Sequence, residues 1–505
     1  MKKAKTIMIQ GTASSAGKSI LVAALCRIFR QDGYRTAPFK AQNMALNSYV
    51  TAEGGEIGRA QAVQAEAAGI APTVDMNPVL LKPTTDSRSQ VIVMGKADRT
   101  ISASDYYQYA PSLLETIEQS LERLRSAYDM VIIEGAGSPA EINLKDREIV
   151  NMRVAKMSGT PVLLVGDIDR GGVFASLVGT LELLDTDERE YIKGLIINKF
   201  RGDIKLLQPA LDFLEERTDK PVLGVIPYFR DIRIAQEDSV YLDERNEGAG
   251  TGDLDIAIVR LHHISNYDDF DPLEEEGCLV RYITQRSEVG NPHLIILPGT
   301  KSTIADLEQL RQSGLANSIL AKAKAGTPVV GICGGYQMLG KKILDPHGAE
   351  SDKKEVEGLG LLDVVTEFAC DKSTSQVRAR VLTDIGLLAG TGGQELAGYE
   401  IHMGQTQCEE KLNAFQIIET PKGTADYADG TLNSQGTVFG TYMHGLFHNA
   451  DFRKTFLNTL RQYWGLAESR GVPTVEKERQ YDKLAELVRN SLDIPAIYEI
   501  MEGQV

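Results

Sequence analysis

A glycine-rich run that ends in Gly-Lys-Ser near the start of the chain is its clearest chemical signal. Glycines at both ends of such a loop let consecutive backbone N–H groups point at one anion, and a following helix adds the positive end of its dipole. The lysine would reach the terminal phosphates of a nucleotide, and the serine hydroxyl would hold Mg²⁺. The alternative is a chance Gly-Lys-Ser in an ordinary turn. The predicted nucleotide-binding residues of this loop are Gly11, Thr12, Gly17, Lys18 and Ser19.

A second signal is a cysteine set between glycines, in the run Gly331-Ile332-Cys333-Gly334-Gly335. Small neighbours tolerate the strained backbone of a nucleophile elbow and leave the thiol accessible. A helix that begins there would help to lower the pKa of the thiol. The N–H of Gly334 and one from the turn at Thr300 would form the oxyanion hole. The alternative is an ordinary buried core thiol at Cys333.

A cysteine nucleophile needs a base, and three histidines are candidates. His444 ends an apolar run and precedes a glycine, which gives it a modest advantage. His402 is the competitor and His448 a weaker one. Spacing alone leaves the choice open.

Polar residues follow the apolar runs of the first half, where the carboxyl ends of parallel strands would gather ligands. Lys40 follows one run and opens an Asn/Gln-rich stretch that suits a substrate loop or an ordinary solvated loop. Glu134 ends another run, in a position to bind Mg²⁺ directly or through water. Asn198 could read a purine edge or cap its strand.

These residues need an alternating pattern of strands and helices to position them, and the chain shows it twice. The expected strands of the first half are Thr6–Gln10, Thr36–Phe39, Met130–Ile133, Val162–Val165, Leu195–Ile197 and Val222–Ile226. We therefore expect an α/β protein with two doubly wound, mainly parallel-sheet domains and a helical C-terminal tail. The expected boundaries are 1–242 for the P-loop domain, 243–253 for a linker, 254–450 for the cysteine domain and 451–505 for the tail.

Composition narrows the class of protein. At 505 residues the chain is too long for one ordinary core. Its net charge of −16 and the lack of a basic stripe argue against nucleic acid as a partner. No apolar run is long enough to span a membrane, which argues against a membrane partner, and five scattered cysteines fit a reducing cytoplasm. The sequence is also compatible with a homo-oligomer.

With five residues between Gly11 and Gly17, the P-loop is longer than usual and resembles that of the dethiobiotin synthetase-like enzymes, which phosphorylate carboxylates or carbamates. Followed by a Cys-His glutaminase, it resembles the glutamine amidotransferases of cobalamin biosynthesis. The segments 38–48, 135–144 and 398–404 are similar to those of the cobyric acid synthase family in particular.

The resemblance implies roles for individual residues. It makes Cys333 the glutaminase nucleophile and His444 its base. It gives ATP and Mg²⁺ as the only cofactors, with no tightly bound prosthetic group. The typical class I glutaminase carries His-x-Glu, whereas His444 is followed by Gly-Leu, so the acid that would orient the base is missing. Lys18 and Lys40 would steady the phosphates or the carboxylate, Asn198 would lie near the adenine, and the implied Mg²⁺ ligands are Ser19, Glu56 and Glu134.

The implied reaction is ATP- and glutamine-dependent amidation of four carboxylates (b, d, e and g) of adenosylcobyrinic acid a,c-diamide, through an acyl phosphate and glutamine-derived ammonia. The substrates are then a corrinoid polycarboxylate and L-glutamine. Two alternatives stay open. One is the sister a,c-diamide synthase or another P-loop amidotransferase, and the other is a partitioning-type P-loop ATPase without amide chemistry.

Overall fold

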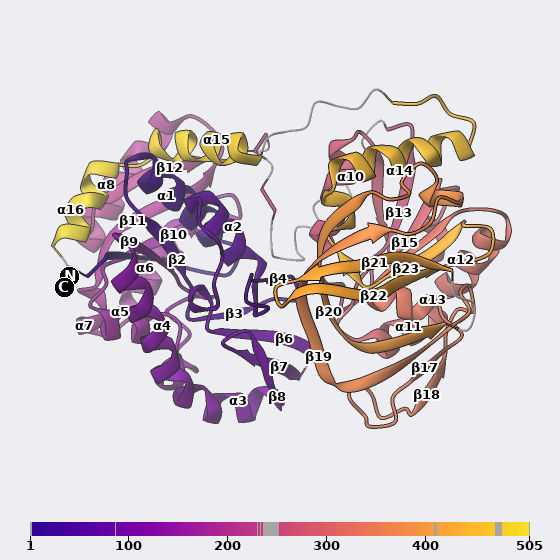
Figure 1. The fold of residues 1–505 in the computed structure, drawn as a ribbon. Coiled ribbons are helices and arrows are strands. Elements are labelled where there is room, and N and C mark those ends of the chain that lie inside the picture. Colours follow the sequence, from indigo (N-terminus) through magenta and orange to yellow (C-terminus); the bar gives the residue numbers. More distant parts are fainter. Residues whose placement is uncertain are drawn as a thin grey trace. The chain divides into compact units, whose positions relative to one another are not determined.

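The computed structural model describes residues 3–85, 87–229, 231–232, 234–235, 252–408, 412–469 and 477–503. The predicted linker 243–253 lies outside the described residues except for its last two positions. The chain forms two compact units (Figure 1). Unit 1 comprises Met1–Ala45, Glu56–Glu237 and Val475–Val505, and unit 2 comprises Leu46–Gly55 and Asp238–Thr474.

Unit 1 is built on a six-stranded parallel sheet in the order β12-β11-β10-β1-β9-β2. Continuous apolar runs form its strands because helices cover both faces of such a sheet. Each of the six predicted strands is present, at β1 (Lys5–Gly11), β2 (Thr36–Phe39), β9 (Met130–Glu134), β10 (Val162–Asp167), β11 (Ile192–Phe200) and β12 (Val222–Pro227). The helices that accompany them are α1 (Lys18–Gln31), α2 (Arg59–Ala68), α3 (Ala103–Tyr109), α4 (Leu114–Ala127), α5 (Met152–Ser158), α6 (Val173–Leu183), α7 (Thr186–Arg189) and α8 (Ile204–Thr218).

Two parts of unit 1 stand apart from this pattern. A four-stranded sheet, in the order β3-β6-β7-β8, is formed by β3 (Gln42–Met44), β6 (Val79–Thr85), β7 (Arg88–Val93) and β8 (Lys96–Ser102), and the short β5 (Glu56–Gly58) precedes α2. The C-terminal helices α15 (Lys477–Arg489) and α16 (Ile494–Glu502) share a core with α1. Tyr481, Leu484 and Val488, on the predicted apolar face of α15, are buried there. The predicted tail 451–505 is thus divided between the two units.

Unit 2 is built on a twelve-stranded sheet with a parallel half and a largely antiparallel half. The parallel half is β14 (Leu279–Ile283), β13 (Asp255–Val259), β15 (Leu294–Leu297), β16 (Val329–Ile332) and β23 (Val438–Thr441). The other half is β22 (Gly423–Leu432), β21 (Asn413–Thr420), β19 (Val364–Val381), β17 (Lys342–Leu344), β18 (Glu355–Glu357), β20 (Glu395–Cys408) and β24 (Met443–His444). The α/β fold class is as predicted, but the alternating pattern did not indicate the long antiparallel strands.

Unit 2 also contains helices and single helical turns. Among them are the 3₁₀ turn η4 (Tyr267–Phe270), with α10 (Asp271–Glu275) directly after it, and the turns η5 (Arg286–Glu288), η6 (Gly386–Leu388) and η7 (Leu446–His448). The longer elements include α11 (Thr303–Gln312), α12 (Leu315–Lys324), α13 (Gly334–Leu339) and α14 (Ala450–Tyr463). Unit 2 also contains β4 (Ser48–Val50), which comes from the N-terminal part of the chain.

Candidate active site

Cys333 occupies the strained turn between β16 and α13. Its φ of 52° and ψ of −109° are unfavourable for a residue with a side chain, and such strain is typical of a nucleophile elbow. Gly331 and Gly335 must be glycines because the backbone leaves no room for a side chain at either position. A Cβ at Gly335 would lie 1.9 Å from the carbonyl oxygen of Leu297, and one at Gly331 would lie 2.7 Å from that of Gly335.

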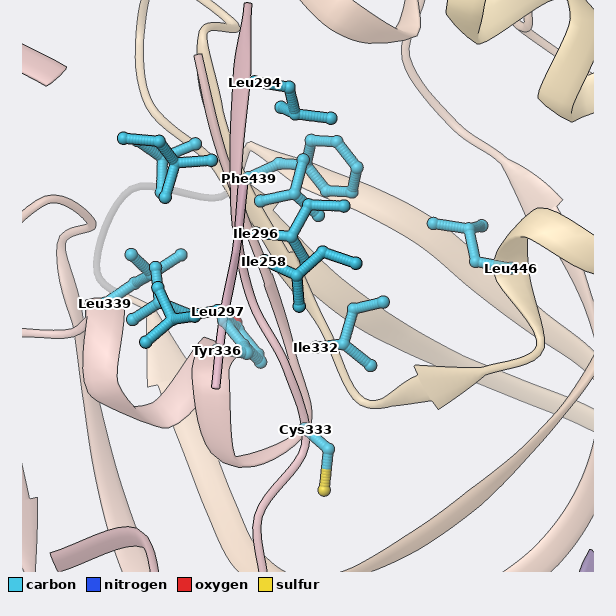
Figure 2. Close-up of a cluster of buried hydrophobic side chains, with 14 of the residues drawn as sticks. Ile258, Leu294, Ile296, Leu297, Ile332, Cys333, Tyr336, Leu339, Phe439 and Leu446 are labelled. Atoms are coloured by element: carbon cyan, nitrogen blue, oxygen red, sulfur yellow. The ribbon is translucent and has the colours of Figure 1, made fainter. Parts of the chain in front are cut away.

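The thiol of Cys333 lies at the edge of the apolar core of unit 2 and is not enclosed by it. Figure 2 shows the sulfur pointing away from Ile332, Leu297 and the other apolar side chains of the cluster. Sγ lies 3.4 Å from the carbonyl oxygen of Ile401, on β20. The elbow therefore directs the sulfur away from the apolar cluster, an orientation that suits a nucleophile.

His444 forms a buried pair with Asp269. Nδ1 of the imidazole lies 2.6 Å from Oδ2 of Asp269, and the Gly445 N–H donates to Oδ1 at 2.8 Å. Both side chains are at most 2% exposed. Burial alone would lower the pKa of His444, but the Asp269 carboxylate outweighs it and, with a contribution from the Cys333 thiol, raises that pKa to about 10. A histidine held in this way keeps Nε2 for the nucleophile.

Asp269 therefore occupies the place of the acid that is missing after His444. It comes from η4, 175 residues earlier in the chain. Sequence analysis did not identify it, because no motif surrounds it and only the closed fold brings η4 to β24. Tyr399, also not predicted, stacks on the His444 ring with centroids 5.2 Å apart and an interplanar angle of 13°.

The two competing histidines are arranged differently. Nδ1 of His402 is hydrogen-bonded to the carbonyl oxygen of Gly404 at 2.8 Å, its ring stacks on Tyr442, and burial lowers its pKa to about 4. His448 is exposed at the end of η7. His444, by contrast, is paired with the buried carboxylate of Asp269.

The structure brings the two predicted oxyanion donors together. A Cβ at Gly334 would lie only 3.1 Å from the backbone nitrogen of Thr300. Thr300 forms an isolated antiparallel bridge with Ile264. The bridge bonds are made by the flanking residues, so the Thr300 N–H points away from Ile264. The backbone nitrogen of Thr300 therefore lies close to Gly334, the other predicted donor, which is the proximity that an oxyanion hole beside Cys333 would need.

In unit 1 the P-loop connects β1 to α1 with the predicted geometry. Gly17 caps α1 in the left-handed region with a φ of 96°, and a Cβ there would lie 2.1 Å from Nδ2 of Asn198. Nζ of Lys18 donates to the carbonyl oxygens of Ala13 and Gly137, at 2.9 and 3.1 Å. The Lys18 ammonium is thus held between the loop and the residues that follow β9.

Other predicted residues of the loop lie close by. The Thr12 N–H donates to the carbonyl oxygen of Val165 at 2.9 Å. A Cβ at Gly11 would lie 3.0 Å from Nζ of Lys18. Asn198 donates from Nδ2 to the carbonyl oxygen of Ala16 at 2.9 Å, so its amide supports the loop itself.

Glu134 is the centre of a buried polar cluster at the end of β9. Its Oε1 accepts hydrogen bonds from Ser19 Oγ and Lys40 Nζ, each at 2.8 Å, and its Oε2 accepts one from Gln64 at 2.6 Å. Gln61 approaches Oε2 at 3.4 Å. Burial alone would raise the pKa of Glu134, but Lys40 and these donors hold it below its usual range. The glutamines of α2 were not identified from the sequence.

The predicted magnesium residues are only partly together. Ser19 contacts Glu134, whereas Glu56 forms a buried ion pair with Lys82, at 2.7 Å between Oε1 and Nζ. Within the described ranges no group of three or more His, Cys, Asp or Glu side chains is arranged to hold a metal. Mg²⁺ at nucleotide sites needs only one or two protein oxygens besides the phosphates, and the Ser19 hydroxyl beside the Glu134 carboxylate fits that requirement.

No helix in the described part of the chain is both long and apolar enough to cross a membrane.

Comparison with known proteins assigns a family to each half of the chain. Residues 7–240 match a CobQ/CobB/MinD/ParA nucleotide binding domain, and residues 255–452 match a CobB/CobQ-like glutamine amidotransferase domain. Two curated relatives are similar over nearly the full length of both chains. The cobyric acid synthase of Dehalococcoides mccartyi (strain CBDB1) is 62% identical and covers 99% of each chain, and that of Sorangium cellulosum (strain So ce56) is 56% identical and covers 97% of each.

Proposed function

The chain belongs to the cobyric acid synthase family, and we propose that it converts the b, d, e and g carboxylates of adenosylcobyrinic acid a,c-diamide to amides, giving adenosylcobyric acid. The enzyme uses glutamine as nitrogen donor in cobalamin biosynthesis. The choice of substrate is supported by one observation. The similarity to proteins named cobyric acid synthase extends over both halves of the chain.

Unit 2 would release ammonia from glutamine. The Cys333 thiolate attacks the side-chain amide carbon, and the N–H groups of Thr300 and Gly334 stabilise the resulting oxyanion. As the C–N bond breaks, the His444 imidazolium protonates the departing nitrogen and ammonia leaves. Water, deprotonated by His444, then cleaves the Cys333 thioester to give glutamate. Asp269 supports both steps because it holds the imidazole by Nδ1 and stabilises its protonated form.

Unit 1 would activate the carboxylate, which is a poor electrophile. The carboxylate oxygen attacks the γ-phosphorus of ATP, ADP leaves, and ammonia then displaces phosphate from the acyl phosphate. The P-loop N–H groups and Lys18 stabilise the transferring phosphoryl group. Mg²⁺, held by Ser19 and Glu134, would neutralise phosphate charge when bound. Glu56 would have to release Lys82 to join them.

The remaining assignments of this proposal follow from chemistry. Lys40 is close enough to Glu134 to respond to the charge of a bound metal or phosphate. Asn198, which braces the P-loop, is at the strand end where an adenine would lie. A reaction that consumes ATP and needs a reduced thiol suits the cytoplasm.

Two other functions are less well supported. The a,c-diamide synthase would share both domains, but the relatives given above are named cobyric acid synthase. A partitioning-type ATPase module would not need the strained Cys333 elbow or the buried His444–Asp269 pair.

The test is mass spectrometry of adenosylcobyrinic acid a,c-diamide incubated with the protein, ATP, Mg²⁺ and glutamine. Stepwise acid-to-amide conversion at four sites is expected. In Cys333→Ala, conversion should stop with glutamine and persist with an added ammonium salt. Loss of conversion with both nitrogen sources would refute the division of the two half-reactions between the units. No conversion by the wild type, with glutamine hydrolysis intact, would point to a different carboxylate substrate.

A further inference from the structure

Ten residues from the N-terminal part of the sequence belong to unit 2, the glutaminase unit. The chain leaves unit 1 after Ala45 and returns to it at Glu56, and the residues between them, 46–55, form part of unit 2. In Figure 1 the indigo strand β4 lies beside the orange strands β19 and β20, and contacts between β4 and both strands agree with that view. We call residues 46–55 the inserted segment.

The inserted segment is built into unit 2 and does not merely lie on its surface. Asn47, Ser48, Val50 and Thr51 are each at most 1% exposed. Nε2 of Gln376, on β19, donates to the carbonyl oxygen of Val50 at 2.9 Å and to the Tyr49 hydroxyl at 3.2 Å. These bonds anchor the segment along β19.

One end of the inserted segment holds the turn that carries Asp269. The Ser48 N–H donates to Oδ1 of Asn266 at 3.0 Å, and the Tyr267 N–H approaches Oδ1 of Asn47 at 3.4 Å. Asn266 has a φ of 52° and caps η4, and its carbonyl oxygen accepts the N–H of Asp269 at 3.1 Å. Two consecutive residues of the segment thus brace the start of the turn from which Asp269 reaches His444.

The middle of the inserted segment supports the other side of the same histidine. The Tyr49 ring packs against Tyr399 with centroids 6.4 Å apart, and Tyr399 stacks on His444. His444 is therefore held by Asp269 at Nδ1 and by Tyr399 on one ring face, and the inserted segment contacts the support of each.

We propose that residues 46–55 are a positioning segment of the glutaminase, in which Asn47 and Ser48 set the η4 turn and Tyr49 sets Tyr399, so that His444 faces Cys333 correctly. This inference rests on the proposed function of Cys333 and His444. Both ends of the segment are covalently continuous with unit 1, so the geometry of the glutaminase base depends on sequence outside the glutaminase domain. None of the three residues is expected to touch glutamine.

The first variant pair is Tyr49→Ala and its control Tyr49→Phe, which keeps the ring against Tyr399. The second variant is Asn266→Gly, which removes the side-chain acceptor and tolerates the positive φ. Its control is Asp219→Gly, at another left-handed residue that is exposed at the end of α8 in unit 1. All are made in the full-length protein, and thermal unfolding is followed for each.

The readouts are kcat and KM for glutamine hydrolysis, the pH profile of that activity, and ammonium-supported amidation. Tyr49→Ala and Asn266→Gly are each expected to lower kcat about tenfold, with KM changed less than about twofold. The reason is that a misplaced base slows the chemical step without weakening the binding of glutamine. Ammonium-supported amidation should stay within about twofold of the wild type, as should both controls in every readout.

The pH profile separates positioning from general destabilisation. Among the described residues, the titratable groups that interact with His444 include Asp269, Cys333, Glu400 and His402. Weakening the hold of Asp269 lowers the pKa of His444, so the alkaline limb of the Asn266→Gly profile should move to lower pH. A variant that is merely less stable would keep the position of that limb.

The outcomes distinguish this inference from the function on which it rests. Wild-type kcat and an unchanged pH profile in Tyr49→Ala and Asn266→Gly, with glutamine hydrolysis still abolished in Cys333→Ala, would overturn the inference alone. A change in KM without a change in kcat would also overturn it, since it would make the segment a glutamine-binding element. Undiminished glutamine hydrolysis in Cys333→Ala would overturn the proposed function itself.

Discussion

Replacing Asp269 by Asn tests the buried pair most directly, because the variant keeps the size of the side chain and removes its charge. The carboxylate accepts from the imidazole at 2.6 Å and from the Gly445 N–H at 2.8 Å, in a site where both partners are at most 2% exposed. The Asn amide oxygen can still accept one of these bonds. The ion pair with His444 is what the substitution removes.

The expected loss follows from that geometry. A hydrogen bond to a charged group contributes about 1.5–3 kcal/mol, and burial of both partners favours the upper end of this range. At about 1.4 kcal/mol per factor of ten, about 3 kcal/mol corresponds to a roughly 10²-fold fall in kcat for glutamine hydrolysis. The loss will be larger if the Asn amide N–H donates to Nδ1, because the proton then sits on Nε2 and His444 cannot accept the proton of the thiol.

The pH dependence has a definite sign. In the wild type Asp269 raises the pKa of His444 to about 10, against the effect of burial. Asp269→Asn removes the largest contribution that opposes burial, so the pKa of His444 falls. At a given pH a smaller fraction of His444 is then imidazolium, and the alkaline limb of the activity profile moves to lower pH.

The same shift affects stability. With the pKa of His444 raised to about 10, the folded wild type binds more protons than the unfolded chain between pH 6.5 and that value. The pair's contribution to the free energy of unfolding is therefore fully present below pH 6.5 and is lost as pH rises, by up to about 1.4 kcal/mol per pH unit. Asp269→Asn should lack this slope in urea unfolding.

The assay is glutamine hydrolysis from pH 6 to 10, with ammonium-supported amidation as the internal control for unit 1. Glutamine hydrolysis by Asp269→Asn within about threefold of the wild-type rate, with an unchanged pH profile, would refute the reasoning. So would an equal loss of the ammonium-supported activity, because that reaction does not use His444.

Three further predictions concern unit 1. Gly17→Ala adds a Cβ 2.1 Å from Asn198 Nδ2 at a φ of 96°, so a fluorescent ATP analogue should bind at least about tenfold more weakly, while unchanged binding would show that the loop can relax. Lys40→Met leaves the Glu134 carboxylate buried without its cation, and the urea transition of unit 1 should lose about 3–5 kcal/mol at pH 7. Because the pKa of Glu134 is lowered in the folded state, the stability that Lys40 contributes is lost as pH falls below about 4.5, and the two proteins should converge in acid. Glu134→Gln should lower ATP-dependent amidation more than about 100-fold and leave glutamine hydrolysis within about twofold; equal loss of both would contradict the assignment.

The local features of both sites follow from the sequence alone. The P-loop and the Cys333 elbow depend on glycines at neighbouring positions, where a side chain would collide with Asn198 or with the carbonyl oxygen of Leu297. Such steric requirements can be recognised from a short stretch of sequence, because they involve glycines at neighbouring positions. Periodicity likewise predicted the six strands of the first sheet, because a buried parallel strand needs a continuous apolar run.

Other features depend on the closed fold. Asp269 meets His444 across 175 residues, and Gln64 of α2 reaches Glu134 at the end of β9. No spacing rule encodes such meetings, because they depend on how the sheets and their connections pack.

The sequence by itself determined that this protein has a phosphate-binding loop, a cysteine elbow and two α/β domains. Only the tertiary structure decided that Asp269 pairs with His444, that α15 and α16 pack in unit 1, and that residues 46–55 belong to unit 2. The physical reason is the range of the forces involved. Backbone strain and apolar periodicity act between near neighbours, whereas buried hydrogen bonds and ion pairs form wherever folding brings their partners together.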